Sequence, residues 1–139
     1  MSSPPHLTGF TTQEAIKDAL HRATIGMDNN VVELTKSAFI HPVDEPVFFM
    51  GEQSFNVDQI LAAVGSMTTA HYNTGIRIDV KDGATTAVLT ANAMNQHFRA
   101  GEGNAPGMPD YNPTSNPNKN LMAGGQYVVD MEKDVKDGD

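Results

Sequence analysis

The chain has 139 residues, 39% of them hydrophobic, and a formal net charge of −8. This length fits one domain with a single core. Without cysteine, the chain has neither disulfides nor cysteine metal sites. Nucleic acids and anionic membranes bind clustered Lys and Arg, so the acidic balance disfavours both as partners. No apolar run approaches the roughly 20 residues of a membrane helix, and residues 1–6 do not resemble a secretory signal. We therefore expect a cytoplasmic protein.

The first half of the chain predicts helices and a short hairpin. Residues 1–10 are expected to form a disordered lead. Thr11 and Glu14 have the spacing of a capping box, and the apolar positions that follow repeat every 3.6 residues as far as Asp28. Asn30 and Glu33 form a second capping box, which predicts a short helix to about residue 39. A small hairpin is expected over 47–55, followed by a third helix over 57–64.

The second half begins with a long β-hairpin over residues 68–98, because Asp82-Gly83 separates two β-rich runs. A two-residue turn there predicts three pairs near the turn: Val80 with Thr85, Ile78 with Ala87, and Ile76 with Leu89. An isolated glycine within a strand often marks a bulge. A bulge at Gly75 shifts the register beyond it, so that His71 pairs with Ala93 and Asn73 with Ala91.

The bulge decides whether the two histidines of the hairpin lie on one face. In a regular register they lie on opposite faces, whereas one extra residue at Gly75 brings them together. The resulting face has aliphatic walls, small residues mid-strand and four polar groups at one end. That combination is more typical of a small-molecule pocket than of a packed core. The residues of this face are His71, Asn73, Ile76, Ile78, Val80, Ala87, Leu89, Ala91, Ala93, Asn95 and His97.

The remaining sequence is a loop, one strand and a charged end. Gly, Pro and Asn dominate residues 101–120, which we expect to form a flexible loop that is either a lid or a disordered insertion. A final strand is predicted over about 121–133. Residues 136–139 repeat the turn chemistry of Lys81-Asp82-Gly83 with no strand after them. They are interpreted either as a turn whose closing strand is missing or as a solvated acidic tail over 135–139.

The order of elements is typical of an α+β fold, and three segments resemble the SnoaL-like family over residues 11–134. These segments are Ala15-Ile-Lys-Asp-Ala-Leu-His-Arg22 leading to Met27-Asp28-Asn29, Thr69-Ala-His71-Tyr, and Arg77-Ile-Asp-Val-Lys-Asp-Gly83. The wider superfamily is the nuclear-transport-factor-two-like, cystatin-like α+β barrel. Its members include polyketide cyclases, scytalone dehydratase, ketosteroid isomerase, limonene epoxide hydrolase and many non-enzymes.

The resemblance implies a cone-shaped barrel, in which a curved antiparallel sheet wraps on the N-terminal helix around a hydrophobic pocket. It implies chemistry without metal or organic cofactor, a role in secondary metabolism, and a homodimer formed through the outer sheet face. That face would carry Thr86, Val88, Thr90, Asn92, Met94 and Phe98. The family normally ends in one more strand after an Asp-Gly turn, and this sequence stops at that turn.

Dehydratase-type members are the most similar at the candidate site. Their first pocket histidine matches His71, their second falls within one position of His97, and their carboxylate within one position of Asp28. The epoxide-hydrolase pattern does not carry over, because Asn92 and Met94 occupy its places. Epoxide hydrolysis is therefore disfavoured, and proton-transfer chemistry is retained.

We therefore expect cyclisation, dehydration or isomerisation of a hydrophobic polyketide- or terpenoid-like substrate. An imidazole titrates near neutrality, so His71 is the candidate acid/base, with His97 or Asp28 as its partner. Asn73 and Asn95 would orient substrate oxygens beside apolar walls formed by Ile76, Leu89, Ala91 and Ala93. The alternatives are a non-catalytic binding or dimerisation module, a truncated inactive paralogue, and a metal site, which has no short ligand spacing to support it.

Overall fold

The computed structural model describes residues 7–65, 67–99 and 120–134. In these residues the chain forms helices and strands in the order α1 (Thr12–Asp28), α2 (Val32–Lys36), β1 (Pro46–Met50), β2 (Gln53–Asn56), α3 (Val57–Gly65), β3 (Met67–Asp79), β4 (Thr86–Arg99) and β5 (Asn120–Glu132). The prediction of an α+β fold is confirmed.

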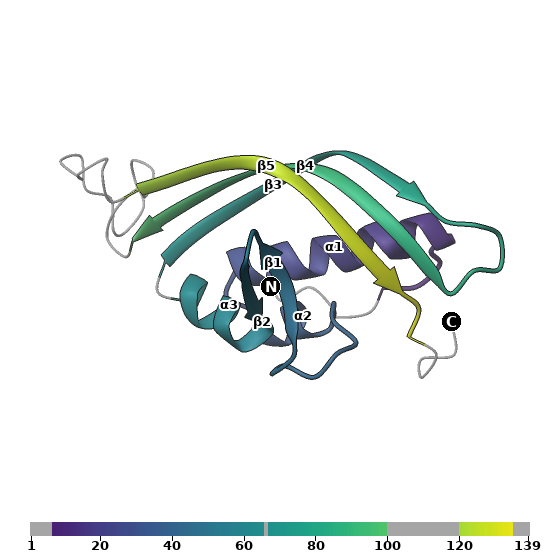
Figure 1. Ribbon diagram of the computed structural model, residues 1–139, viewed down its shortest axis with the longest axis horizontal. Helices are drawn as coiled ribbons and strands as arrows, with labels where there is room; N and C mark the ends of the chain where they lie inside the picture. The colour runs from purple at the N-terminus through teal and green to yellow at the C-terminus, as the bar shows by residue number, and fades with distance from the viewer. Residues whose placement is uncertain (1–6, 66, 100–119, 135–139) are drawn as a thin grey trace.

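The long strands form one curved antiparallel sheet in the order β3-β4-β5, and β1 pairs separately with β2. Figure 1 shows α1, α3 and the β1–β2 hairpin together on the concave side of this sheet. The core lies between α1 and the sheet, where Leu20 packs against Leu89 and Ala91. The described sheet is curved but not closed, so the expected barrel is present as an open cone.

The first helix begins as predicted, and the second does not. Thr11 accepts a hydrogen bond from the Glu14 backbone, and the Glu14 carboxylate accepts one from the Thr11 backbone. Asn30, in contrast, adopts a left-handed φ of 54° just after α1. The N-cap of α2 is therefore Val31, which makes no side-chain cap. The prediction of an Asn30–Glu33 capping box was wrong because Asn30 is used to reverse the chain.

The long hairpin contains the predicted bulge but not the predicted partners. The register shifts between Thr74 and Arg77, and Gly75 between them has a left-handed φ of 59°. The turn is wider than two residues, because Asp79 pairs with Val88. Three of the expected pairs are wrong by two positions: Ile78 pairs with Leu89, His71 with Asn95, and Asn73 with Ala93. The other two are not formed, because Val80 and Ile76 have no partner in the register.

A displacement of two positions leaves each side chain on its expected face, since successive side chains in a strand alternate. The inner positions of β4, from Ala87 to Ala93, are buried, while Tyr72 and Met94 on the other face are about half exposed. The predicted face that carries both histidines and both asparagines is therefore confirmed.

The final strand is present, and several predictions fall outside the described residues. β5 pairs with β4 along its length, and Tyr127, Val129 and Met131 pack against the core. The prediction of a loop over 101–120 concerns residues outside the described ranges, apart from Asn120 at the start of β5. The end of the chain after residue 134, the lead over 1–6 and the side chain of Phe98 also lie outside them.

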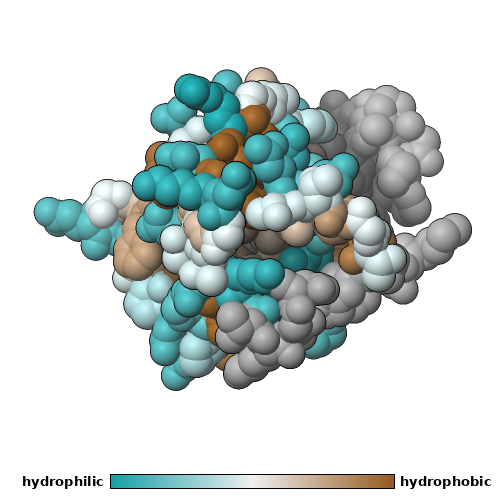
Figure 2. Space-filling view, turned by 90° about the vertical axis from the view of Figure 1, so that its right-hand side faces the viewer, coloured by the Kyte–Doolittle hydropathy of each residue, from teal (hydrophilic) through white to brown (hydrophobic). Residues whose placement is uncertain are grey.

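Hydrophilic residues dominate the end of the molecule that carries the β3–β4 turn and the start of α1. Figure 2 shows hydrophobic residues there only as small separate patches. Among the described helices, none has the length and apolar character needed to cross a membrane.

Candidate active site

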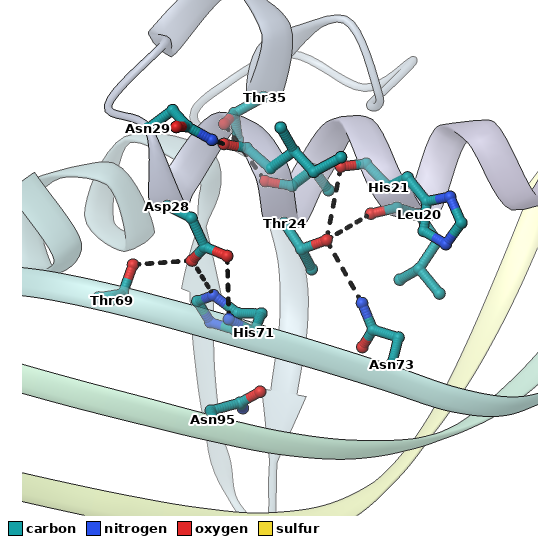
Figure 3. A network of polar contacts seen from close by, with 12 residues as sticks. Leu20, His21, Thr24, Asp28, Asn29, Thr35, Thr69, His71, Asn73 and Asn95 are labelled. Atoms are coloured by element: carbon teal, nitrogen blue, oxygen red, sulfur yellow. Dashed lines mark hydrogen bonds and ion pairs between the residues drawn. The ribbon is translucent and has the colours of Figure 1, made fainter.

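The site is built where the last residue of α1 meets the edge of β3. The Asp28 carboxylate accepts three hydrogen bonds from that strand (Figure 3). They come from the Thr69 hydroxyl at 2.9 Å, the His71 backbone N–H at 2.9 Å and the His71 ring nitrogen Nδ1 at 2.5 Å. The His71 side chain is only 5% exposed and that of Asp28 20%. The expected position of Asp28 beside His71 is thus observed.

These contacts keep Asp28 ionised. Burial acts to raise the pKa of its carboxyl, but the hydrogen bonds from the ring and backbone of His71 and from Thr69 outweigh burial. The pKa of Asp28 therefore lies below its ordinary value. An ionised carboxylate only accepts hydrogen bonds, so the nitrogen that faces it, Nδ1 of His71, carries a proton.

Fixing the proton on Nδ1 determines what the other ring nitrogen does. In a neutral imidazole one nitrogen donates and the other accepts. Nε2 of His71 is therefore the basic nitrogen, and no described residue hydrogen-bonds to it. The arrangement is that of a general base held in one tautomer by a carboxylate.

His97 lies beside His71, with ring centroids 5.5 Å apart and an interplanar angle of 57°. Burial lowers the pKa of His97, and positive charge on His71 lowers it further, against the opposing effect of Asp28. Nε2 of His97 is buried without a hydrogen-bond partner among the described residues. His97 is thus a second imidazole at the same end of the sheet, and burial favours its neutral form.

The two asparagines flank the histidines, each held by one hydrogen bond. Asn73 Nδ2 donates to the Thr24 hydroxyl at 3.3 Å, and Asn95 Nδ2 donates to the Tyr127 hydroxyl at 3.0 Å. The Oδ1 atom of each asparagine is buried, and no described group donates to it. Both asparagines therefore have an acceptor left for a ligand.

The apolar part of the predicted pocket is largely core. Leu89 and Ala91 are 0% and 1% exposed and pack against Leu20, and Ile76 packs against the same cluster. A residue without exposed surface touches no space of the size of a water molecule. The prediction that Leu89 and Ala91 line an open pocket was therefore wrong. Ala93, one step nearer the polar end, lies opposite Asn73.

A groove reaches the site along the free edge of β3. It encloses about 330 Å³ and is lined on the helix side by His21, Thr24 and Ile25 and on the strand side by residues 71–74. His71 and Asn73 therefore lie on the wall of an open groove.

The comparisons with known proteins place this chain in a family. A family model described as SnoaL-like domain matches residues 10–138. The chain belongs to the SnoaL-like family. It is also 32% identical over 140 residues to the "Terrestric acid biosynthesis cluster protein E" of Penicillium crustosum, a match that covers 97% of this chain and 81% of that protein.

Two solved structures share the fold of this SnoaL-like chain. One is a candidate scytalone dehydratase from Novosphingobium aromaticivorans, with 19% identity, a TM-score of 0.61, and coverage of 88% of this chain and 74% of that chain. The other is the Kfla4162 protein from Kribbella flavida, with 16% identity, a TM-score of 0.57, and coverage of 85% and 78%. At these identities the likeness shows the fold alone.

Three residues of the site were not named as site residues from the sequence. Thr69 precedes His71 by two positions and Tyr127 follows the alternation of β5, so both could have been found by counting along the inner face. Thr24 is one turn from Leu20 on the buried side of α1 and could have been found from the helical period. In the described ranges, no three His, Asp or Glu side chains are placed to hold a metal ion.

Proposed function

We propose that this protein is a small-molecule enzyme of secondary metabolism that catalyses proton transfer without a cofactor. The reaction would be a dehydration, cyclisation or isomerisation of a hydrophobic, oxygenated substrate of the polyketide or terpenoid kind. The observation that carries the proposal is the 2.5 Å contact between Asp28 Oδ1 and His71 Nδ1, which leaves Nε2 as the base. The biosynthetic-cluster relative and the dehydratase-like fold neighbour support the same class.

In this proposal His71 removes a proton from a carbon next to a carbonyl group. The proton moves to Nε2, and the electron pair of the broken C–H bond becomes a new double bond. In a dehydration, a hydroxyl on the adjacent carbon departs and takes up a proton, so that water leaves. The imidazolium of His71 can return that proton itself, or neutral His97 can exchange it, because their rings are 5.5 Å apart.

Asp28 serves this step as a positioning residue rather than a base. Its carboxylate stabilises the imidazolium that forms on His71 and holds the ring in place. Positioned general acid–base catalysis typically contributes about 100-fold to 10,000-fold to a rate. The His71 imidazole is the group from which we expect most of that factor.

The proposal is tested by proton abstraction from a simple probe. The aldol adduct of benzaldehyde and acetone is a β-hydroxy ketone that loses water to give an absorbing conjugated enone. In deuterium oxide, exchange at the carbon next to its carbonyl also reports abstraction without water loss. We expect both signals with the wild type and a loss of about 100-fold or more with His71→Asn. His41→Ala alters an exposed imidazole far from the site in sequence and should change neither signal.

A folded protein that binds the probe without exchange or elimination would contradict catalysis. Equal rates for the wild type and His71→Asn would contradict the role of His71. Binding without turnover would favour the alternative of a ligand-binding module.

We also propose a homodimer through the outer face of the sheet. Tyr72 and Met94 lie side by side in the register and are 52% and 51% exposed, and Val128 on β5 is 67% exposed. No element within the described ranges covers this face (Figure 1). A second copy of the chain would bury these side chains.

A further inference from the structure

The two borders of the main sheet differ in how they are protected. Along β3, α1 packs against the strand, the Asp28 carboxylate accepts a hydrogen bond from the His71 N–H, and the register is interrupted near Gly75. Covering elements, charges and bulges of this kind keep an edge strand from pairing with other chains. β5 forms the other border, and no described strand pairs with its free edge (Figure 1).

Alternate backbone groups of β5 point away from β4 and toward this free edge. The Lys133 N–H donates to the Thr85 carbonyl at 2.8 Å, one step beyond the last pair of the ladder, Thr86 with Glu132. Hydrogen-bonded and non-hydrogen-bonded pairs alternate in an antiparallel ladder. Odd-numbered residues of β5 therefore bond to β4, and the N–H and C=O groups of even-numbered residues face outward. The outward-facing residues are Met122, Gly124, Gln126, Val128, Asp130 and Glu132.

The opposite border requires the same alternation. The His71 N–H faces away from β4, so His71 and its partner Asn95 are a non-hydrogen-bonded pair. The backbone groups of Asn95 therefore face β5, where its partner is the odd-numbered Ala123. Two separate hydrogen bonds thus place the even-numbered backbone groups of β5 at the free edge, and no described residue hydrogen-bonds to them there.

The inner side chains of β5 indicate what would pack beside a further strand. Tyr127, Val129 and Met131 contact the core but are only partly buried. The inner residues of β4, from Ala87 to Ala93, have a strand on both sides and are buried. A strand added beside β5 would therefore bring apolar side chains next to these three residues and complete their burial.

The outer side chains of β5 indicate the charge of that strand. Asp130 and Glu132 face Val88 and Thr86 on β4, which are uncharged. Within the described part of the chain, neither carboxylate has an ion-pair partner. Opposite charges directly across two strands stabilise their pairing and like charges weaken it. A strand that pairs here should therefore carry Lys or Arg on its outer face.

We propose that the free edge of β5 binds an extended segment of another polypeptide, in which apolar residues alternate with Lys or Arg. Hydrogen bonds to the outward backbone groups supply affinity, and the alternating side chains supply specificity. A second copy of β5 does not fit this description, because residues 120–132 contain no Lys, Arg or His. The edge lies in the plane of the sheet, so the proposed dimer through the outer face leaves it exposed. The proposal does not depend on the proposed catalysis.

Amide hydrogen exchange, with a synthetic strand as the probe, tests this proposal. The probe is Lys-Val-Lys-Val-Lys-Val-Lys with blocked ends, added to the full chain. In the free protein the amides of Gln126, Val128 and Asp130 should exchange faster than those of Tyr127 and Val129, which bond to β4. The probe should slow the first three by about tenfold or more and leave the other two unchanged. The same peptide with Glu in place of Lys should bind about tenfold more weakly or worse.

Two variants at one position separate pairing from packing. Val128→Pro removes an outward N–H and leaves the hydrogen bonds to β4 intact, since proline is tolerated on an edge strand when its nitrogen faces solvent. It should weaken binding of the lysine peptide by about fivefold or more. Val128→Thr keeps the N–H and the β-branched shape, and should bind the peptide as the wild type does. If Val128→Pro does not fold, the exchange pattern of the wild type still decides.

The proposal would be overturned if the lysine peptide left the outward amides unchanged, or if folded Val128→Pro bound it as well as the wild type. Equal binding of the glutamate peptide would contradict a basic partner. Outward amides that exchange slowly in the free protein would show that the edge is already filled. Faster exchange on dilution would then assign the edge to a second copy, and exchange independent of dilution to the chain itself. Either result would overturn the proposal.

Discussion

Replacing Asp28 by asparagine separates the chemistry of the site from its packing. The amide has nearly the shape of the carboxylate but one donor in place of an acceptor. If its oxygen faces the His71 backbone N–H, its nitrogen faces Nδ1 and the Thr69 hydroxyl. Every polar group is then satisfied if Nδ1 gives up its proton and Nε2 takes one. Asp28→Asn is therefore expected to reverse the tautomer of His71 and remove the base while the fold persists.

The stability cost follows from the three hydrogen bonds that Asp28 accepts. A hydrogen bond to a charged group contributes about 1.5–3 kcal/mol and a neutral one about 0.5–1.5. Changing three such bonds from charged to neutral lowers the free energy of unfolding by about 3–4.5 kcal/mol. For a chain of this length we expect the melting temperature to fall by roughly 10–15 °C.

The loss of unfolding free energy caused by Asp28→Asn must also depend on pH, because the pKa of Asp28 is lower in the folded than in the unfolded protein. Its stabilising contribution is fully present above the unfolded pKa of about 3.9. It is lost as the pH falls below that value and through the folded pKa. The difference in unfolding free energy between the wild type and Asp28→Asn should therefore be constant near neutrality and shrink below about pH 4.

Denaturant unfolding from pH 7 to pH 3 measures this difference, with Asp58→Asn as the matched control. Asp58 is 57% exposed and pairs with Lys36 at 3.9 Å, so its replacement should cost less than about 0.5 kcal/mol. A cost for Asp28→Asn no larger than that of the control would refute the reasoning. A cost that grows on acidification would do the same.

Three further predictions concern His97, the bulge and the outer face. The pKa of His97 is lower in the folded protein than in the unfolded chain, so on acidification the unfolded chain binds a proton at His97 before the folded protein does. The stability of the wild type should therefore fall below about pH 6.5. The fall should be smaller in His97→Gln, and calorimetry at several pH values measures it. Gly75→Ala should cost about 1–2 kcal/mol for its positive φ, and more than Gly83→Ala, which has a positive φ too but no neighbour for its Cβ, whereas the Cβ at position 75 contacts Asn92; equal losses in thermal unfolding would count against that contact. Met94→Glu should shift a dimer to monomer in light scattering, and a wild type that is monomeric at all concentrations would contradict the proposed interface.

The sequence predicts the bulge and the shared face because both depend only on whether a residue lies at an odd or an even position along its strand. Gly75 interrupts a clear alternation, and one extra residue there is enough to bring His71 and His97 to one side. The exact partners depend on the width of the turn at Asp82-Gly83, which adds two positions and leaves the faces unchanged. Turn width depends on backbone angles that the Asp-Gly signal alone does not specify.

The contacts between α1 and β3 could not be predicted in the same way. The carboxylate of Asp28 and the imidazole of His71 are 43 positions apart in the chain. Their meeting depends on how the helix lies along the sheet edge, which periodicity within either element does not determine. The family resemblance named both residues, but only the structure shows which ring nitrogen of His71 the carboxylate holds. The bond between Thr24 and Asn73, which are 49 positions apart, could not be predicted for the same reason.

The central claim is that Asp28 holds His71 with its proton on Nδ1, so that Nε2 is free to act as a base. Nitrogen-15 magnetic resonance of the histidine rings measures this directly, because protonated and unprotonated ring nitrogens have different chemical shifts. In the neutral ring of His71 we predict a protonated Nδ1 and an unprotonated Nε2 in the wild type, and the reverse in Asp28→Asn. A wild-type His71 with its proton on Nε2 would contradict the account.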